Sequence, residues 1–126
     1  MLHQLLYIKQ RKERTIRNSI SRVVRLQKQV EQEIIKLRQL QTETQKAWQL
    51  ACSQFAGKVE RLSLMKWQED MRSYQTKYEN IGLQVAKMAQ QREILIEKEN
   101  ELQGMLKEVL IAQEKINYII ATEDSP

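Results

Sequence analysis

Side chains that could carry catalytic or metal chemistry are few in this chain and far apart. It has one histidine, His3, and one cysteine, Cys52, so a nucleophile, a base and an orienting group cannot be assembled from them. Zinc would lack ligands for the same reason. Carboxylate pairs such as Glu97 with Glu101 fall on expected helix surfaces, where no cleft would desolvate them. The sequence therefore predicts a protein that is not an enzyme and holds neither a metal nor a cofactor.

The elements that could position any site must be long, because the chain has almost no residues that favour turns. Among 126 residues there are three glycines, Gly57, Gly82 and Gly104, and one proline, the final residue. That scarcity argues against a sandwich, a barrel or an α/β domain, and the glycines are too widely spaced for a phosphate-binding loop. Only 41% of residues are hydrophobic and 29% are charged, so no thick core can form. One or two very long helices remain.

Hydrophobic residues recur at alternate steps of four and three along two stretches of the chain. From Trp67 to Ile120 this stepping visits 16 positions, of which 13 are apolar, and from Leu2 to Phe55 it visits 16, of which 11 are apolar. Such a sustained spacing is typical of a coiled-coil seam, in which the a and d positions of a heptad face a partner helix. We expect two seams, the second stronger than the first.

The two seams match if the chain folds back near residue 61, because facing residues then have numbers that add to 122. Every seam position meets a seam position in this register, and Gln27 faces Leu95 while Lys9 faces Gln113. Polar seam residues cost stability but favour one register. A register shifted by a whole heptad would also pair the seams. A continuous single helix that pairs between chains is a further alternative.

The predicted fold is all-α, a long antiparallel two-helix coiled-coil hairpin formed by residues 1–126 as one domain. Gly57 is suited to end the first helix, and Ser63 is suited to cap the second. These two residues bracket the expected turn. We predict helix 1 at about 2–57, the turn at about 58–63, helix 2 at about 64–121 and a short polar tail at 122–126.

Charge is distributed unevenly between the two arms. Residues 9–28 hold eight basic residues and one acidic residue, whereas residues 93–124 hold eight acidic and three basic residues. The hairpin places these stretches side by side, which favours either charge matching between the helices or a basic surface that meets an acidic protein. A nucleic-acid partner is not expected, since an acidic arm lies beside the basic one and no binding motif is present. No run of apolar residues exceeds four, so no direct membrane insertion is expected.

Some apolar residues fall at the outward b, c and f positions of the heptads, where a seam cannot bury them. These eight residues are Tyr7, Ile8, Ile35, Leu50, Leu83, Ile94, Ile111 and Tyr118. Four of them lie near the termini and suggest a docking patch there: Tyr7, Ile8, Ile111 and Tyr118. A second apolar cluster near the turn either seals the hairpin tip or binds a partner; it comprises Trp48, Leu50, Phe55, Val59, Leu62, Leu64, Met65 and Trp67.

Two stretches of the chain resemble a known family. They are Leu5-Leu6-Tyr7-Ile8-Lys9 with the basic helix through Arg25, and Leu64-Met65-Lys66-Trp67-Gln68 with the heptads to Val85-Ala86-Lys87-Met88. Both are similar to the FliJ/YscO (SctO) family, the small central stalk proteins of bacterial type III secretion systems. Size and hairpin architecture extend the resemblance along the whole chain.

The resemblance implies a non-enzymatic stalk in the bacterial cytoplasm, peripheral at the inner-membrane secretion apparatus. In that family the hairpin enters the pore of the hexameric secretion ATPase, stimulates it and links it to the cytoplasmic ring of the export gate; secretion chaperones are further partners. Carried onto this chain, the ATPase-binding candidates are Tyr7, Ile8, Arg11, Lys12, Arg14, Arg17, Arg22 and Ile111. The export-gate-binding candidates are Trp48, Phe55, Val59, Leu62, Leu64 and Trp67.

Two other functions fit the same pattern. One is an escort protein that holds secretion chaperones or helical cargo against an uncovered apolar stripe. The other is a structural coiled coil that associates with itself into a four-helix bundle, which would cover the same surface without a foreign partner.

Overall fold

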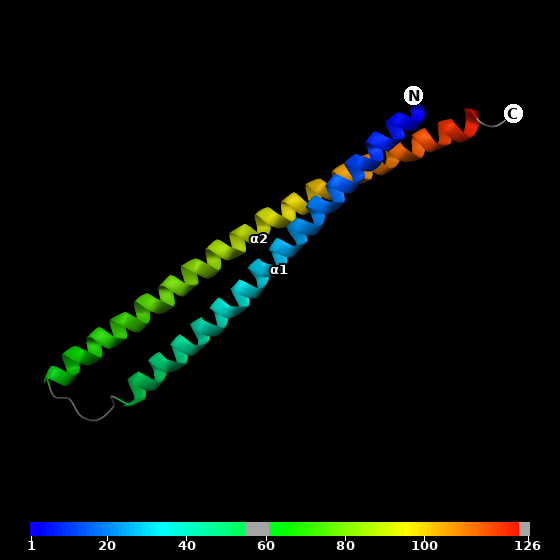
Figure 1. Cartoon of the computed structure of the whole chain (residues 1–126). Coiled ribbons are helices and arrows are strands. Elements are labelled where there is room, and N and C mark those ends of the chain that lie inside the picture. Colours follow the sequence, from blue (N-terminus) through cyan, green and yellow to red (C-terminus); the bar gives the residue numbers. More distant parts are fainter. Residues whose placement is uncertain (55–60, 124–126) are drawn as a thin grey trace. The chain divides into compact units, whose positions relative to one another are not determined.

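A computed structural model of the chain describes residues 1–54 and 61–123, apart from the side chains at 61–63. It contains two helices, α1 at Leu2–Gln54 with 53 residues and α2 at Arg61–Glu123 with 63 residues. The described residues include no strand, and the two helices lie against each other in opposite directions (Figure 1). The predicted all-α antiparallel hairpin is therefore confirmed.

The described part of α1 reaches Gln54, and the predicted end at 57 lies outside the described residues. Helix α2 already includes Arg61, before the predicted start at 64. Ser63 thus lies inside α2, and its prediction as the N-cap is wrong. The third residue after Ser63 is Lys66 rather than an acid, so the sequence offers no capping box that would begin the helix there. The predicted helix stop at Gly57 lies outside the described residues.

Contacts between residues divide the hairpin into two units, each with one segment from each helix. We call residues 1–28 and 93–126 the terminal unit, and residues 29–92 the turn unit. Two long helices touch only neighbours at the same level, so each unit has its own stretch of seam.

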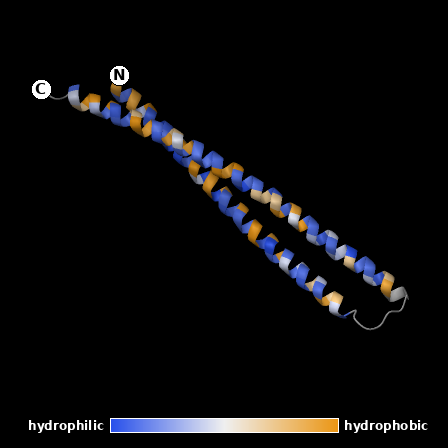
Figure 2. Cartoon of the chain, turned by 180° about the vertical axis from the view of Figure 1, so that it is seen from behind, coloured by the Kyte–Doolittle hydropathy of each residue, from blue (hydrophilic) through white to orange (hydrophobic). Residues whose placement is uncertain are grey.

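The pattern of burial confirms the predicted seams. Each described seam position from Leu2 to Ala51 and from Trp67 to Ile120 is buried or partly buried. Figure 2 shows hydrophobic residues recurring along both ribbons between hydrophilic ones. The most deeply buried residues all lie at seam positions; they are Ile16, Val23, Ile34, Leu37, Thr44, Ile81, Leu106, Val109 and Ile116. Helix formation here rests on burying this one stripe, because short-range propensity alone contributes little.

Aliphatic side chains form the core of the terminal unit. Ile16 of α1 packs with Leu106 and Val109 of α2, and Ile20 and Leu110 pack against this cluster. The numbers of Ile16 and Leu106 add to 122, as the predicted register requires.

In the seam of the turn unit, aromatic side chains join the buried Ile34, Leu37 and Ile81. The rings of Trp48 and Tyr78 lie 6.4 Å apart between centroids at an interplanar angle of 60°. The register places Tyr74 opposite Trp48, and Tyr78 follows one helical turn later. The large indole ring of Trp48 therefore contacts a residue one turn away from its facing position. Nearby, Cys52 Sγ lies 3.3 Å from Met71 Sδ.

Candidate functional site

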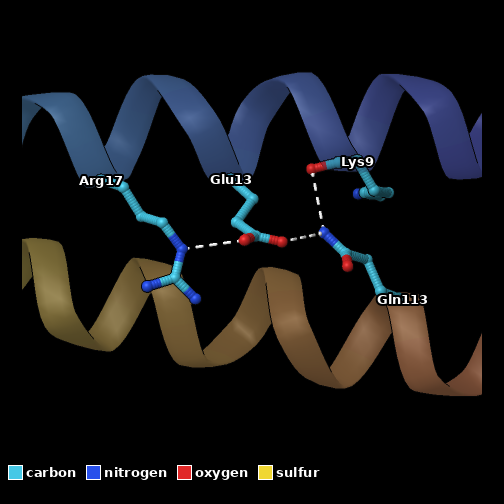
Figure 3. Close-up of polar contacts among 4 residues, drawn as sticks. All are labelled: Lys9, Glu13, Arg17 and Gln113. Atoms are coloured by element: carbon cyan, nitrogen blue, oxygen red, sulfur yellow. Dashed lines mark hydrogen bonds and ion pairs between the residues drawn. The ribbon is translucent and has the colours of Figure 1, made fainter.

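Two glutamines cross the seam of the terminal unit, and the first is Gln113. Its Nε2 donates hydrogen bonds to the carbonyl oxygen of Lys9 at 3.3 Å and to Glu13 Oε1 at 3.0 Å. Glu13 Oε2 in turn accepts from Arg17 Nε at 2.8 Å (Figure 3). The hydrogen bond from Arg17, followed by that from Gln113, lowers the pKa of the Glu13 carboxyl below its ordinary value. Three side chains and one backbone carbonyl therefore form a polar chain that joins α1 to α2.

Gln27 makes the second polar crossing. Its Nε2 donates to the carbonyl oxygen of Leu95 at 3.2 Å and to Glu99 Oε2 at 2.7 Å. Both crossings confirm the predicted facing pairs, Gln27 with Leu95 and Lys9 with Gln113. Partly buried polar groups cost free energy unless they are hydrogen-bonded, and these two glutamines find partners in this register.

The basic segment of α1 is exposed and does not form the expected ion pairs with α2. Among the described residues the one ion pair is Arg17 with Glu13, and it lies within α1. Charge matching by direct contact between the helices is thus absent from the part of the chain that the structure describes. The exposed basic side chains of this segment are Arg11, Lys12, Arg14, Arg17, Arg22, Arg25 and Lys28.

Heptad positions explain why the acids of α2, apart from the seam residue Glu99, do not reach α1. With Leu106 at an a position, the e and g positions beside the seam carry no acid in the terminal unit. Instead they are Ile96, Gln103, Leu110 and Asn117 at e, and Lys98, Met105, Ala112 and Ile119 at g. Acids such as Glu97, Glu101 and Glu108 stand at f and c positions and point away from α1. Opposite charge is therefore spread over the outer surfaces of the two helices.

The eight apolar residues predicted to face outward are all exposed. However, the four near the termini do not share one face. Tyr7 is at a b position and Ile8 at a c position of α1, on opposite sides of that helix, while Ile111 and Tyr118 are at f positions on the back of α2. The Arg11 guanidinium lies over the Tyr7 ring, 5.9 Å from its centroid, which joins this tyrosine to the basic segment.

The candidates near the turn divide into buried and undescribed residues. Trp48, Leu64 and Trp67 are partly buried at the seam, so they hold the two helices together. Leu62 belongs to α2 and its side chain lies outside the described residues, as do Phe55 and Val59 altogether. Leu50 and Met65 are exposed, at 59% and 58%, so their side chains are accessible to a partner protein that binds the turn unit.

Sequence reasoning missed one surface of the terminal unit, along the g positions of both helices. In an antiparallel pair the g positions of the two helices border the same side of the seam. Exposed apolar residues occupy four of these positions, and we call them the terminal apolar stripe: Leu5 and Leu26 of α1 with Met105 and Ile119 of α2. The sequence does contain a signal for this surface. Leu5 and Leu26 are 21 positions apart and Met105 and Ile119 are 14 apart, so each pair is separated by whole heptads beside the seam.

In the turn unit a groove on the same side of the seam is lined mostly by polar and charged residues. Its lining residues are Leu40, Glu69, Arg72, Ser73, Thr76, Lys77, Asn80, Ile81 and Gln84. The two units therefore present different surfaces on corresponding sides of their seams.

Within the described residues, His, Cys, Asp and Glu side chains nowhere gather in a group of three that could hold a metal ion. None of the described helices is both long and apolar enough to cross a membrane. Comparison of the chain with protein-family models, curated proteins and solved structures finds no match in any of the three. The surfaces above are therefore the basis for inferring function.

Proposed function

We propose that this protein is a non-enzymatic central stalk of a bacterial type III secretion system, in the cytoplasm at the inner-membrane apparatus. Its terminal unit binds the hexameric secretion ATPase, and its turn unit binds the cytoplasmic ring of the export gate. The observation that carries the proposal is the exposed basic segment of α1, whose Arg11, Lys12, Arg14 and Arg22 form no ion pair among the described residues. A cationic helix face of this kind suits an acidic protein surface.

Stimulation requires no chemistry from the stalk itself. A hairpin has no six-fold symmetry, so inside a six-fold pore it touches the ATPase subunits unequally. Unequal contacts stabilise different subunits in different nucleotide states, which is a differential binding free energy rather than catalysis. The basic segment, with Tyr7 held beside Arg11, supplies contacts that can differ from one subunit to the next.

Charge reversal tests the ATPase surface. Arg11→Glu with Arg14→Glu should lower the affinity for a purified type III secretion ATPase roughly tenfold, and more at low salt than at high salt. Both side chains are exposed, so helicity should not change. The matched control is Arg38→Glu with Lys46→Glu, two exposed bases of the turn unit on the same helix.

The measurement is the concentration of stalk that gives half-maximal ATPase stimulation, with helicity followed by circular dichroism. If the terminal and the control variants stimulate the ATPase equally, the basic segment does not bind the ATPase. Stable complexes with secretion chaperones in the absence of any ATPase would favour the escort function instead.

A separate variant tests the turn unit. Met65→Glu changes an exposed side chain close to the start of α2 and should weaken binding to the export-gate ring. Leu83→Glu is the control, since Leu83 is exposed in the same unit but lies 18 residues further along α2. If both variants bind the ring as the wild type does, the turn unit is not the docking end.

A further inference from the structure

The terminal apolar stripe follows the g positions from the termini to the inner end of its unit, and Lys12 of α1 and Lys98 of α2 interrupt it. Leu5 and Ile119 lie at one level of the antiparallel pair, and Ser19 and Met105 lie at another, because the residue numbers of each g pair add to 124. Leu5, Leu26, Met105 and Ile119 are exposed at 42%, 39%, 45% and 44%. Leucine, isoleucine and methionine in a row beside a seam are the side chains that a four-helix bundle buries.

Apolar residues at neighbouring c positions widen the stripe. Ile8 of α1 and Ile94 of α2 are each 58% exposed and stand on the same side of the seam. Small side chains, Ser19 and Ala112, occupy g positions between the large ones and are partly buried. The surface therefore has projections and depressions at heptad spacing, the relief that knobs-into-holes packing needs.

The edges of the stripe carry opposite charges at its centre. At the flanking c positions, Arg22 borders it on α1, while Glu101, Glu108 and Lys115 border it on α2. Arg22 and Glu101 stand at nearly the same level on opposite edges, and neither belongs to an ion pair in the described residues. Over longer range α1 contributes eight bases and one acid at 9–28, and α2 contributes eight acids and three bases at 93–124.

We propose that the terminal apolar stripe is a self-association surface covered by the stripe of a second copy. A two-fold axis parallel to the helices places α1 of one copy against α2 of the other at the same level. Arg22 of each copy then faces Glu101 of the other, and the basic segments face acidic ones. A two-fold axis perpendicular to the helices would place the two basic segments against each other, which charge repulsion disfavours.

This inference does not depend on the proposed stalk function. If both hold, Ile8, Lys12 and Arg22 belong to the dimer surface and to the ATPase-binding candidates, so the dimer and the ATPase complex exclude each other. The test of self-association uses the isolated full chain, and its result does not change with the outcome of the ATPase experiment.

The first experiment is sedimentation of the full chain over a range of concentrations. The wild type should change from monomer to dimer as concentration rises. Met105→Lys should weaken the dimer at least about tenfold, because it places a charge in the centre of the stripe. Leu83→Lys is the control, since it adds the same charge at a 70% exposed apolar site of the turn unit and should leave the dimer intact. Circular dichroism of each variant checks that the helices are retained.

The second experiment tests the orientation by charge exchange. Arg22→Glu alone and Glu101→Arg alone should each dimerise roughly threefold to tenfold more weakly, since like charges then face each other in both contacts. An equimolar mixture of the two variants should recover the wild-type affinity, because each mixed dimer has opposite charges in both contacts.

Three results would overturn the proposal: a wild type that stays monomeric throughout, equal loss from Leu83→Lys and Met105→Lys, or a mixture that associates no better than either charge variant. A monomeric wild type would mean that the stripe, if it is covered at all, is covered by a helix of a different protein.

Discussion

The terminal unit and the turn unit use the same two helices but fill their seams differently. In the terminal unit an aliphatic cluster around Ile16 is combined with two glutamines that donate hydrogen bonds across the seam. In the turn unit buried Ile34, Leu37 and Ile81 are combined instead with a Trp48–Tyr78 ring pair. A buried Thr44 of this unit donates its hydroxyl to the Leu40 carbonyl oxygen at 2.8 Å within α1.

This difference separates two tasks of a coiled-coil seam. Apolar and aromatic side chains provide affinity between the helices but tolerate sliding, because dispersion and the hydrophobic effect have no direction. Hydrogen bonds from Gln27 and Gln113 have direction and a fixed partner, so they specify which residues face each other. We infer that the terminal unit sets the register and that the turn unit follows it.

The outer surfaces differ as well. The terminal unit has an apolar stripe beside its seam, whereas the turn unit has on the corresponding side a groove lined mostly by polar and charged residues. Exposed apolar residues that are grouped on one surface are a common mark of an interaction site. The comparison therefore points to the terminal unit as the main place of association.

The largest expected effect is on the aliphatic core of the terminal unit. Ile16→Ala removes a buried side chain that contacts Leu106 and Val109, and should lower the free energy of unfolding by about 2–3 kcal/mol. Ile35→Ala, at a 56% exposed site of α1, should change it by less than about 0.5 kcal/mol. Urea unfolding followed by circular dichroism measures both, and similar values would mean that the seam is not the stabilising element.

A smaller effect is expected at the polar crossings. Gln27→Ala leaves the Glu99 carboxylate without its donor at a partly buried position and should cost about 1–2 kcal/mol. Gln41→Ala is the control, because Gln41 is a partly buried seam glutamine of the turn unit. The same unfolding experiment should give a clearly smaller loss for Gln41→Ala, and an equal loss would remove the distinction between the units.

Glycine replacement should stabilise both units slightly. A Cβ added at Gly104 meets no atom within 4 Å, and one added at Gly82 lies 3.5 Å from Gln41 Nε2, an ordinary contact. Each alanine variant should therefore gain about 0.5–1 kcal/mol, the difference in helix propensity. Thermal unfolding tests this. If Gly104→Ala is more stable yet associates less well, a partner approaches the backbone there.

The smallest effect concerns pH. The pKa of Glu13 is lowered chiefly by the Arg17 hydrogen bond, so this carboxylate stabilises the fold above its ordinary pKa of 4.5, and the contribution is lost as pH falls through the lowered value. Glu13→Gln should therefore be less stable than the wild type near neutral pH and equal to it in acid. Arg17→Gln is the control, because it removes the main hydrogen bond to Glu13 and should also reduce the pH dependence of stability. Unfolding midpoints measured at a series of pH values distinguish the three proteins.

Much of the fold could be predicted from the sequence. Burial at alternate steps of four and three requires only that each helix has one partner, so the seams from Leu2 and from Trp67 were predictable from periodicity alone. Exposure of Tyr7, Ile35 and Leu83 followed from the same heptads. The start of α2 was harder to predict, because Ser63 is a weak local signal and α2 begins before it.

The candidate surfaces were predicted only in part. The basic segment of α1 was evident from composition, but its expected partners on α2 were not found, since Glu101 and Glu108 stand at outward positions. Tyr7, Ile8, Ile111 and Tyr118 looked like one patch because they are near the termini, although heptad geometry places them on different faces. Counting charges along a stretch ignores direction, and direction around the helix decides which side chains meet.

The sequence by itself determined that this chain is a long-helix protein with one apolar seam along each half, because glycine and proline are scarce and hydrophobic residues follow a heptad period. Only the tertiary structure decided that the two halves pair within one chain and which heptad of α1 faces which heptad of α2. A seven-residue repeat looks the same after a shift of seven, and the hydrogen bonds of Gln27 with Glu99 and of Gln113 with Glu13 identify the register that the structure adopts.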